Sequence, residues 1–86
     1  MSYFVYILEC NDGSLYTGIT KNVKKRVDEH NVSTKGAKYT KARRPVQLLY
    51  CESSEDRSSA SKREYAIKKL TRSKKLELIN LSKNDF

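Results

Sequence analysis

The chain has 86 residues, of which 37% are hydrophobic and 33% are charged, and it carries a formal net charge of +8 at pH 7. A chain of this length buries about 60% of its unfolded surface, which predicts one domain over residues 1–86 and leaves no room for a second. The charge indicates a polyanionic partner, first of all nucleic acid. No apolar run approaches the ~20 residues of a membrane span, and there is no signal region, so we expect a cytoplasmic protein.

The chain begins with a predicted hairpin. Residues 3–10 are rich in aromatic and β-branched side chains and run into Asn-Asp-Gly at 11–13, a strong turn signal. Residues 14–19 are expected to return as the partner strand.

A helix is expected next. Thr20 or Asn22 can cap its beginning, and Val23 and Val27 lie four apart, which gives the helix an apolar stripe. We expect this helix to end near Asn31.

The middle of the chain loses periodicity. Residues 32–45 predict a long loop, or a loop with a short helical turn, of the length that is usually functional or mobile. Residues 46–51 then form a nearly continuous apolar run, which is typical of a central strand. Cys10 and Cys51 each end a predicted strand without metal-ligand spacing, so they are interpreted as small buried hydrophobes in a reducing compartment.

Two helices are predicted at the end. Ser53 or Ser54 can cap the first, over about 55–70, with acids in its first turn. Thr71 or Ser73 can cap the second. Ala60, Tyr65, Ile67 and Leu70 of the first helix can face the sheet, and the second helix is expected to run through Leu76, Ile79 and Leu81. The order of elements predicts an α+β fold, with a small three-stranded, mostly antiparallel sheet flanked by helices.

The predicted hairpin carries two related motifs, Phe-Val-Tyr at 4–6 and Tyr-Thr-Gly at 16–18. Together they resemble the paired motif that names the GIY-YIG nuclease family. The next helix contains Arg26 and His30, and a later helix contains Glu64, the three further positions that such a domain uses. The resemblance implies the fold of that family and hydrolysis of a phosphodiester.

The resemblance extends over about residues 3–79. The stretches 15–20, 36–40 and 43–46 are similar to those of small bacterial stand-alone members, which are themselves similar to the N-terminal nuclease domain of the excinuclease C protein. The departures change packing positions and keep both tyrosines; they are Phe4 for glycine, Val5 for isoleucine and Thr17 for isoleucine.

Glu64 is the only acid between Arg57 and Glu77, in a strongly basic segment. A lone carboxylate can hold Mg²⁺ by one oxygen while water and phosphate complete the shell. The alternative is an i,i+4 pair with Lys68, which contributes only ~0.2–0.5 kcal/mol. Two-metal nucleases need several acids to hold ions about 4 Å apart, so the sequence favours a single Mg²⁺ or Mn²⁺ ion on Glu64.

Arg26 and His30 lie four apart and can point together at one phosphate, unless they merely belong to a solvated basic face. A guanidinium can grip two phosphate oxygens and counter the charge of the transition state. The hairpin can bring Tyr6 and Tyr16 to the same site. A tyrosine of ordinary pKa needs a nearby cation to act as a general base, so Tyr6, Tyr16 and His30 all remain candidates for the base.

The segment 35–44 is basic and contains no acid. Its cations can neutralise phosphates and release counterions, and Tyr39 can stack on a base or simply lie at the edge of the core. The residues expected to contact nucleic acid are Lys35, Lys38, Tyr39, Lys41, Arg43, Arg44 and, from the later helix, Lys68.

These observations favour a metal-dependent DNA endonuclease that hydrolyses one strand without a covalent intermediate. We expect it to be structure-directed and to act in DNA repair or recombination, on structured or branched DNA rather than plain duplex, with a targeting protein as an optional second partner. The alternative is a nucleic-acid-binding module that cleaves weakly or not at all. A basic RNA-binding or ribosome-associated protein would explain the charge but not the tyrosines, arginine and glutamate.

Overall fold

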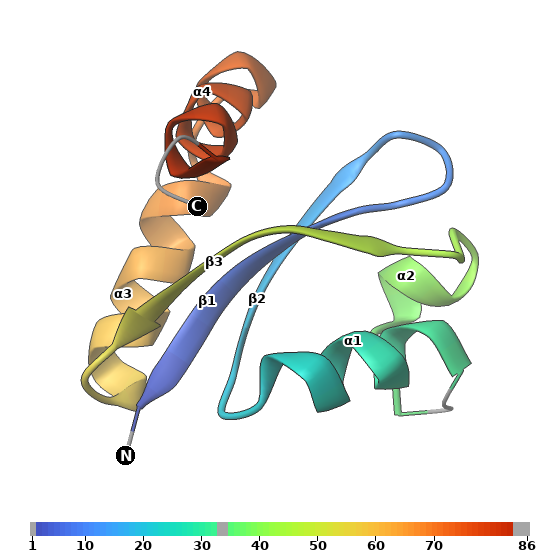
Figure 1. Ribbon diagram of the computed structural model, residues 1–86, viewed down its shortest axis with the longest axis horizontal. Helices are drawn as coiled ribbons and strands as arrows, with labels where there is room; N and C mark the ends of the chain where they lie inside the picture. The colour runs from blue at the N-terminus through green and yellow to red at the C-terminus, as the bar shows by residue number, and fades with distance from the viewer. Residues whose placement is uncertain (1, 33–34, 84–86) are drawn as a thin grey trace.

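A computed structural model describes residues 2–32 and 35–83, with side chains as far as residue 81. In this part of the chain the elements are β1 (Tyr3–Glu9), β2 (Leu15–Thr20), α1 (Val23–Val32), α2 (Lys38–Lys41), β3 (Gln47–Ser54), α3 (Arg57–Lys68) and α4 (Arg72–Lys83). Figure 1 shows α3 and α4 to one side of the sheet and α1 and α2 to the other. The expected α+β fold is confirmed, including the short helical turn in the middle loop.

The sheet has the order β2-β1-β3, and both pairings are antiparallel. The prediction that the third strand is central was wrong, because β1 is the strand that pairs on both sides. The reason is burial. Val5, Tyr6, Ile7 and Leu8 of β1 are all buried, whereas β3 is half-buried or exposed along its length.

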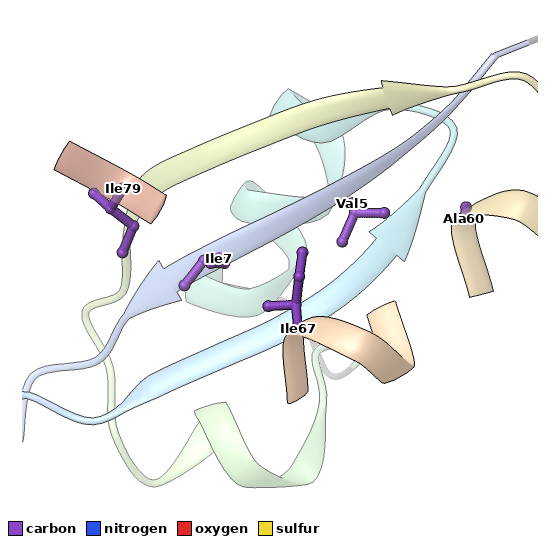
Figure 2. Close-up of a cluster of buried hydrophobic side chains, with 5 residues drawn as sticks. All are labelled: Val5, Ile7, Ala60, Ile67 and Ile79. Carbon is purple, nitrogen blue, oxygen red and sulfur yellow. The ribbon is translucent and has the colours of Figure 1, made fainter. Parts of the chain in front are cut away.

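Each face of β1 builds its own core, because successive side chains of a strand point to opposite faces. Figure 2 shows the apolar core on the side of α3 and α4, which consists of Val5, Ile7, Ala60, Ile67 and Ile79. The opposite core consists of Tyr6, Leu8, Cys10 and Val46, with Tyr16, Val27 and Cys51 packed against it. The second core therefore contains both tyrosines of the paired motif.

The sheet-facing side of α3 differs from the prediction. Ala60 and Ile67 are buried as expected, but Tyr65 is 62% exposed and Leu70 is 37% exposed, so the prediction for these two residues was wrong. Residues 60, 64 and 67 share one face of a helix, and residue 65 lies about a quarter turn away. Glu64 therefore lies on the same stripe as the two buried apolar residues, and its side chain is only 23% exposed.

Hydrogen bonds from backbone N–H groups to side chains identify the residues that cap the helices. Asn22 accepts from the Lys25 N–H at 3.1 Å and Thr71 from the Lys74 N–H at 3.2 Å, which confirms one of the two alternatives for each helix. The cap of α3 was wrongly assigned to Ser53 or Ser54, because β3 continues through Ser54. Asp56 caps α3 instead and accepts from the Ser59 N–H at 2.8 Å.

Three further expectations concern α4, the cysteines and membrane spans. The last helix runs through Leu76, Ile79 and Leu81 as expected, and of these three residues only Ile79 is buried. Both cysteines are free thiols and pack in or against the second core, as small hydrophobes do. None of the helices in the described residues is long and apolar enough to cross a membrane.

Candidate functional site

The ring of Tyr6 occupies the space above Gly18, its antiparallel partner on β2. A Cβ atom on Gly18 would lie 2.5 Å from the Tyr6 hydroxyl oxygen and 2.7 Å from Cζ, so any other residue would displace the ring. Tyr16 is two residues away on the same face of β2, and the centroids of the two tyrosine rings are 6.4 Å apart. The glycine of the second motif thus makes room for the tyrosine of the first.

A chain of buried hydrogen bonds begins at the Tyr6 hydroxyl. It lies 2.9 Å from His30 Nε2, and His30 Nδ1 lies 2.8 Å from the hydroxyl of Thr40. The Thr40 hydroxyl in turn donates to the Ala37 carbonyl at 2.9 Å. A threonine hydroxyl has only one proton, so Thr40 must accept from His30. The proton of the ring is therefore on Nδ1, and Nε2 accepts from Tyr6.

His30 is fully buried, with no exposed surface. This burial, together with the nearby positive charge of Arg26, lowers the pKa of His30 to about 4. The ring is neutral at pH 7, as the hydrogen bonds require. Sequence reasoning placed Arg26 and His30 together at one phosphate, but both ring nitrogens of His30 are already occupied by Tyr6 and Thr40. His30 reaches the site through the Tyr6 hydroxyl.

Arg26 and Glu64 lie close enough to Tyr6 to influence its ionisation. Burial raises the pKa of Tyr6 to about 12, the Arg26 guanidinium opposes this shift, and the Glu64 carboxylate adds to it. Arg26 is held in place by hydrogen bonds to Glu29, at 3.2 Å, and to the Lys35 carbonyl, at 2.9 Å. Tyr6 and Arg26 therefore lie together, and Glu64, from a different helix, is near enough to act on Tyr6 through its charge.

Glu64 also pairs with Lys68 at 3.5 Å, so the alternative expected from the sequence is present. Lys68 is half-exposed, and pairs of this kind contribute little. Across residues 2–32 and 35–83 no three His, Cys, Asp or Glu side chains gather as a metal cage. A single carboxylate oxygen suits Mg²⁺, which usually keeps several waters and binds through one or two carboxylates together with substrate phosphates.

A pocket of about 250 Å³ lies beside these residues. Tyr16 and Thr17 both line it, although consecutive residues of a strand point to opposite faces of the sheet. The pocket therefore runs around the free edge of β2, from the face of the tyrosines to the face of α3. The full lining is Leu15, Tyr16, Thr17, Tyr39, Lys68 and Lys75.

The basic segment, residues 35–44, reaches the same edge through Tyr39, and several of its side chains make contacts within the protein. Tyr39 stacks on Tyr16 with ring centroids 6.0 Å apart. Arg43 pairs with Asp12 at 3.0 Å and lies over the Tyr39 ring. Arg44 donates to the carbonyls of His30 and Glu29 at the end of α1, and Lys35, Lys38 and Lys41 are exposed. Contact of these residues with nucleic acid stays a prediction.

Two residues of the site were not anticipated from the sequence. Thr40 selects the tautomer of His30, and Lys75 lines the pocket at the β2 edge. In the sequence, Thr40 is distinguished only as a polar residue in a basic loop. Its position opposite His30 depends on how α2 packs against α1. Lys75 is one lysine among many in its segment.

Residues 2–77 match the family described as the GIY-YIG catalytic domain. The chain is 56% identical over 85 residues to a UPF0213 protein of Desulfotalea psychrophila, covering 99% of this chain and 77% of that protein. It is 62% identical over 78 residues to a UPF0213 protein of Staphylococcus aureus, covering 91% and 94%. The solution NMR structures of a UPF0213 protein from Bacillus halodurans and a protein from E. faecalis are each 46% identical, with TM-scores of 0.60 and 0.64, covering 94% of this chain and 85% of theirs.

Gly18→Ala is expected to displace the Tyr6 ring. Overpacking of this kind lowers the free energy of unfolding by about 1–3 kcal/mol, measurable by urea unfolding, and the ring nitrogens of His30 should shift in NMR spectra because the Tyr6 hydrogen bond is disturbed. Gly13→Ala is the control. Gly13 has a φ of 83° and nothing within 4 Å of an added Cβ, so it should lose stability through its backbone alone. Unchanged His30 signals in Gly18→Ala would contradict the geometry.

His30 should be neutral at pH 7, with its proton on Nδ1, in nitrogen-15 NMR spectra. Its folded pKa of about 4 lies below the ordinary 6.5, so between these values the unfolded chain binds the extra proton. The free energy of unfolding should therefore rise by roughly 3 kcal/mol as the pH rises through this window. This contribution to stability is lost again as the pH falls through the same window.

The chain has a single histidine, so the assignment is direct. His30→Gln should remove this part of the pH dependence. Thr40→Val should let the proton move from Nδ1 to Nε2, because the acceptor on Nδ1 is gone. A ring protonated on Nε2 in the unmodified protein would refute the hydrogen-bond assignment.

Proposed function

The chain belongs to the GIY-YIG family, a family of nucleases, and from this membership and the geometry of its site we propose that it is a metal-dependent DNA endonuclease. The proposal includes hydrolysis of one strand, action on structured or branched DNA in repair or recombination, and a single Mg²⁺ or Mn²⁺ ion. Its net charge of +8 supports binding to a phosphate backbone.

One observation carries the proposal, which is the set of groups around the Tyr6 hydroxyl. His30 Nε2 accepts a hydrogen bond from this hydroxyl, and the Arg26 guanidinium and the Glu64 carboxylate both influence the ionisation of Tyr6. A buried tyrosine that serves only as a core residue needs one hydrogen-bond partner. It does not need an arginine and an acid from two separate helices, and such perturbed clusters are typical of functional sites.

The hydrogen-bond directions supply a path for a proton. Tyr6 donates to His30 Nε2, so lone pairs of its oxygen remain available to a water molecule that attacks phosphorus. When that water loses a proton to the Tyr6 oxygen, the phenolic proton can pass to Nε2, and no separate phenolate of pKa about 12 has to form first. Thr40 keeps Nε2 unprotonated and ready to accept.

The other residues act on charge. Arg26 has the planar donor group that holds phosphate oxygens and counters the negative charge of the transition state. Glu64 is the residue that would hold the divalent ion, and when bound that ion would stabilise the charge on the phosphate and leaving oxygens. Glu64 is half-buried on the sheet side of α3, which restricts its position before any ion binds.

A second candidate function is a nucleic-acid-binding module that cleaves weakly or not at all. The Glu64–Lys68 pair favours it, because the ammonium lies 3.5 Å from the carboxylate that the metal requires. Lys68 must turn away, or contact a phosphate instead, before Glu64 can hold an ion. Lys68 is 53% exposed, so it has solvent to move into.

Glu64→Gln and Arg26→Ala should each slow Mg²⁺-dependent nicking by about 100-fold or more, because a charge-stabilising group is lost from the transition state. The assay uses single-stranded, duplex, flap and four-way junction DNA with Mg²⁺, Mn²⁺ or EDTA. The matched control is Glu77→Gln, which removes an exposed acid paired with Lys74. If the protein binds junction DNA but cuts it no faster than Glu64→Gln does with either metal, the protein is a binding module instead.

The single-turnover cleavage rate should change little between about pH 6 and 9. Tyr6, whose pKa is about 12, stays protonated and His30, with a pKa of about 4, stays neutral throughout this range, so the pair that relays the proton is present at every pH in it. A rate that rises about tenfold per pH unit would indicate that the water or Tyr6 must first lose its proton and would contradict the relay from Tyr6 to His30.

A further inference from the structure

The pocket at the free edge of β2 contains features that the cleavage chemistry does not use. It is lined by side chains from β2, α2, α3 and α4. Its volume of about 250 Å³ is below the roughly 300–1,000 Å³ of pockets for drug-sized ligands. It has room for one small planar group and the polar atoms attached to it.

Thr17 is the first unexplained feature. The residue is 4% exposed, and its Oγ1 is the buried side-chain oxygen or nitrogen in the described residues that has no hydrogen-bond partner. Leaving such a group unpaired destabilises the folded protein. Thr17 faces Ile7 across the strand pair, on the side of the apolar core, where a valine would fit without this loss. A hydroxyl there is accounted for if a ligand supplies its partner.

Lys75 is the second unexplained feature. The other lysines whose side chains the structure describes are exposed, whereas Lys75 is half-buried. No ion pair within the described residues engages its ammonium group; the neighbouring Lys74 is the lysine that pairs with Glu77. A partly buried cation without a counter-ion is stabilised by an anion, and Lys75 lines the same pocket as Thr17.

An aromatic wall is the third feature. Tyr16 and Tyr39 stack on each other and both line the pocket. Arg43 covers one face of the Tyr39 ring, 3.9 Å from its centroid, but is not among the pocket residues. Tyr39 is 40% exposed, so part of the wall is open to solvent. Aromatic walls of this kind hold nucleobases by stacking, without regard to sequence.

We propose that this pocket binds one unstacked nucleotide of the nucleic-acid strand, with its base against Tyr16 and Tyr39, a polar atom hydrogen-bonded to Thr17, and a phosphate near Lys68 and Lys75. The proposal rests on the proposed function, because it places this nucleotide next to Glu64 through the Glu64–Lys68 pair. It adds a base-binding subsite on the strand to be cut, and it accounts for a preference for DNA in which bases are not stacked in a continuous duplex.

The test compares two short fluorescent single strands of equal length, oligothymidylate and its fully abasic counterpart, by anisotropy in EDTA. Both carry the same phosphates, so the ratio of their dissociation constants reports base binding alone. The protein should prefer oligothymidylate by about tenfold. Tyr39→Leu should abolish this preference, while Tyr65→Leu, which removes an exposed tyrosine that contacts Lys69, should keep it.

Thr17→Val separates a binding role from a structural one. It should raise or maintain the midpoint of urea unfolding, because an unpaired hydroxyl is removed, and yet weaken oligothymidylate binding about fivefold. Lys75→Gln should weaken the binding of both strands and lower the salt dependence of that binding. Lys74→Gln should have a smaller effect on both quantities. Equal affinity of the protein for both strands, or wild-type binding by Thr17→Val, overturns the subsite. Because EDTA removes the divalent cation that cleavage needs, a preference for bases stands even if the protein cleaves nothing.

Discussion

The hydrogen bond between the Tyr6 hydroxyl and His30 is the interaction on which the rest of the site depends. It joins the central strand to α1 inside a core that is otherwise apolar, where an unpaired hydroxyl or imidazole would be costly. Each polar atom in the chain from Tyr6 to Ala37 finds a partner, and the single proton of Thr40 sets the direction of all three bonds. Satisfied buried networks of this kind favour one arrangement over its alternatives.

The two faces of β1 have different roles, because one packs against α3 and the other carries Tyr6. On one face, Val5 and Ile7 pack against α3 and fix its position, and a Tyr50–Glu52–Arg63 network ties α3 to β3 beside Glu64. On the other face the polar chain orients Tyr6. The pocket at the edge of β2 links the two faces, because Tyr16 and Lys68 both line it, and the position of Glu64 relative to Tyr6 depends on how α3 packs on the sheet. Small changes in the apolar core should therefore affect the site.

Much of this could be predicted from local sequence. The hairpin follows from its turn residues, the paired motif contains Tyr6 and Tyr16, and the family resemblance pointed to Arg26 and Glu64. The predictions that were wrong concern features that depend on contacts between residues distant in sequence. The apolar run at 46–51 could not reveal that β1 would occupy the centre of the sheet. Tyr65 was expected to face the sheet because it is aromatic, but the buried stripe of the helix passes through the preceding residue, Glu64. Thr40 meets His30 only because α2 packs against α1.

The free edge of β2 explains why so basic a chain carries its functional groups there. An unpaired edge exposes backbone donors and acceptors and invites association with other strands. Here α3, α4 and the basic segment bring Lys68, Lys75 and Tyr39 beside that edge. Like charges repel a second copy of the chain, whereas a phosphate backbone is attracted. The same cations that discourage strand addition thus attract nucleic acid to the edge of the sheet around which Tyr6 and Glu64 lie, so protection of the edge and recruitment of the substrate are one electrostatic property.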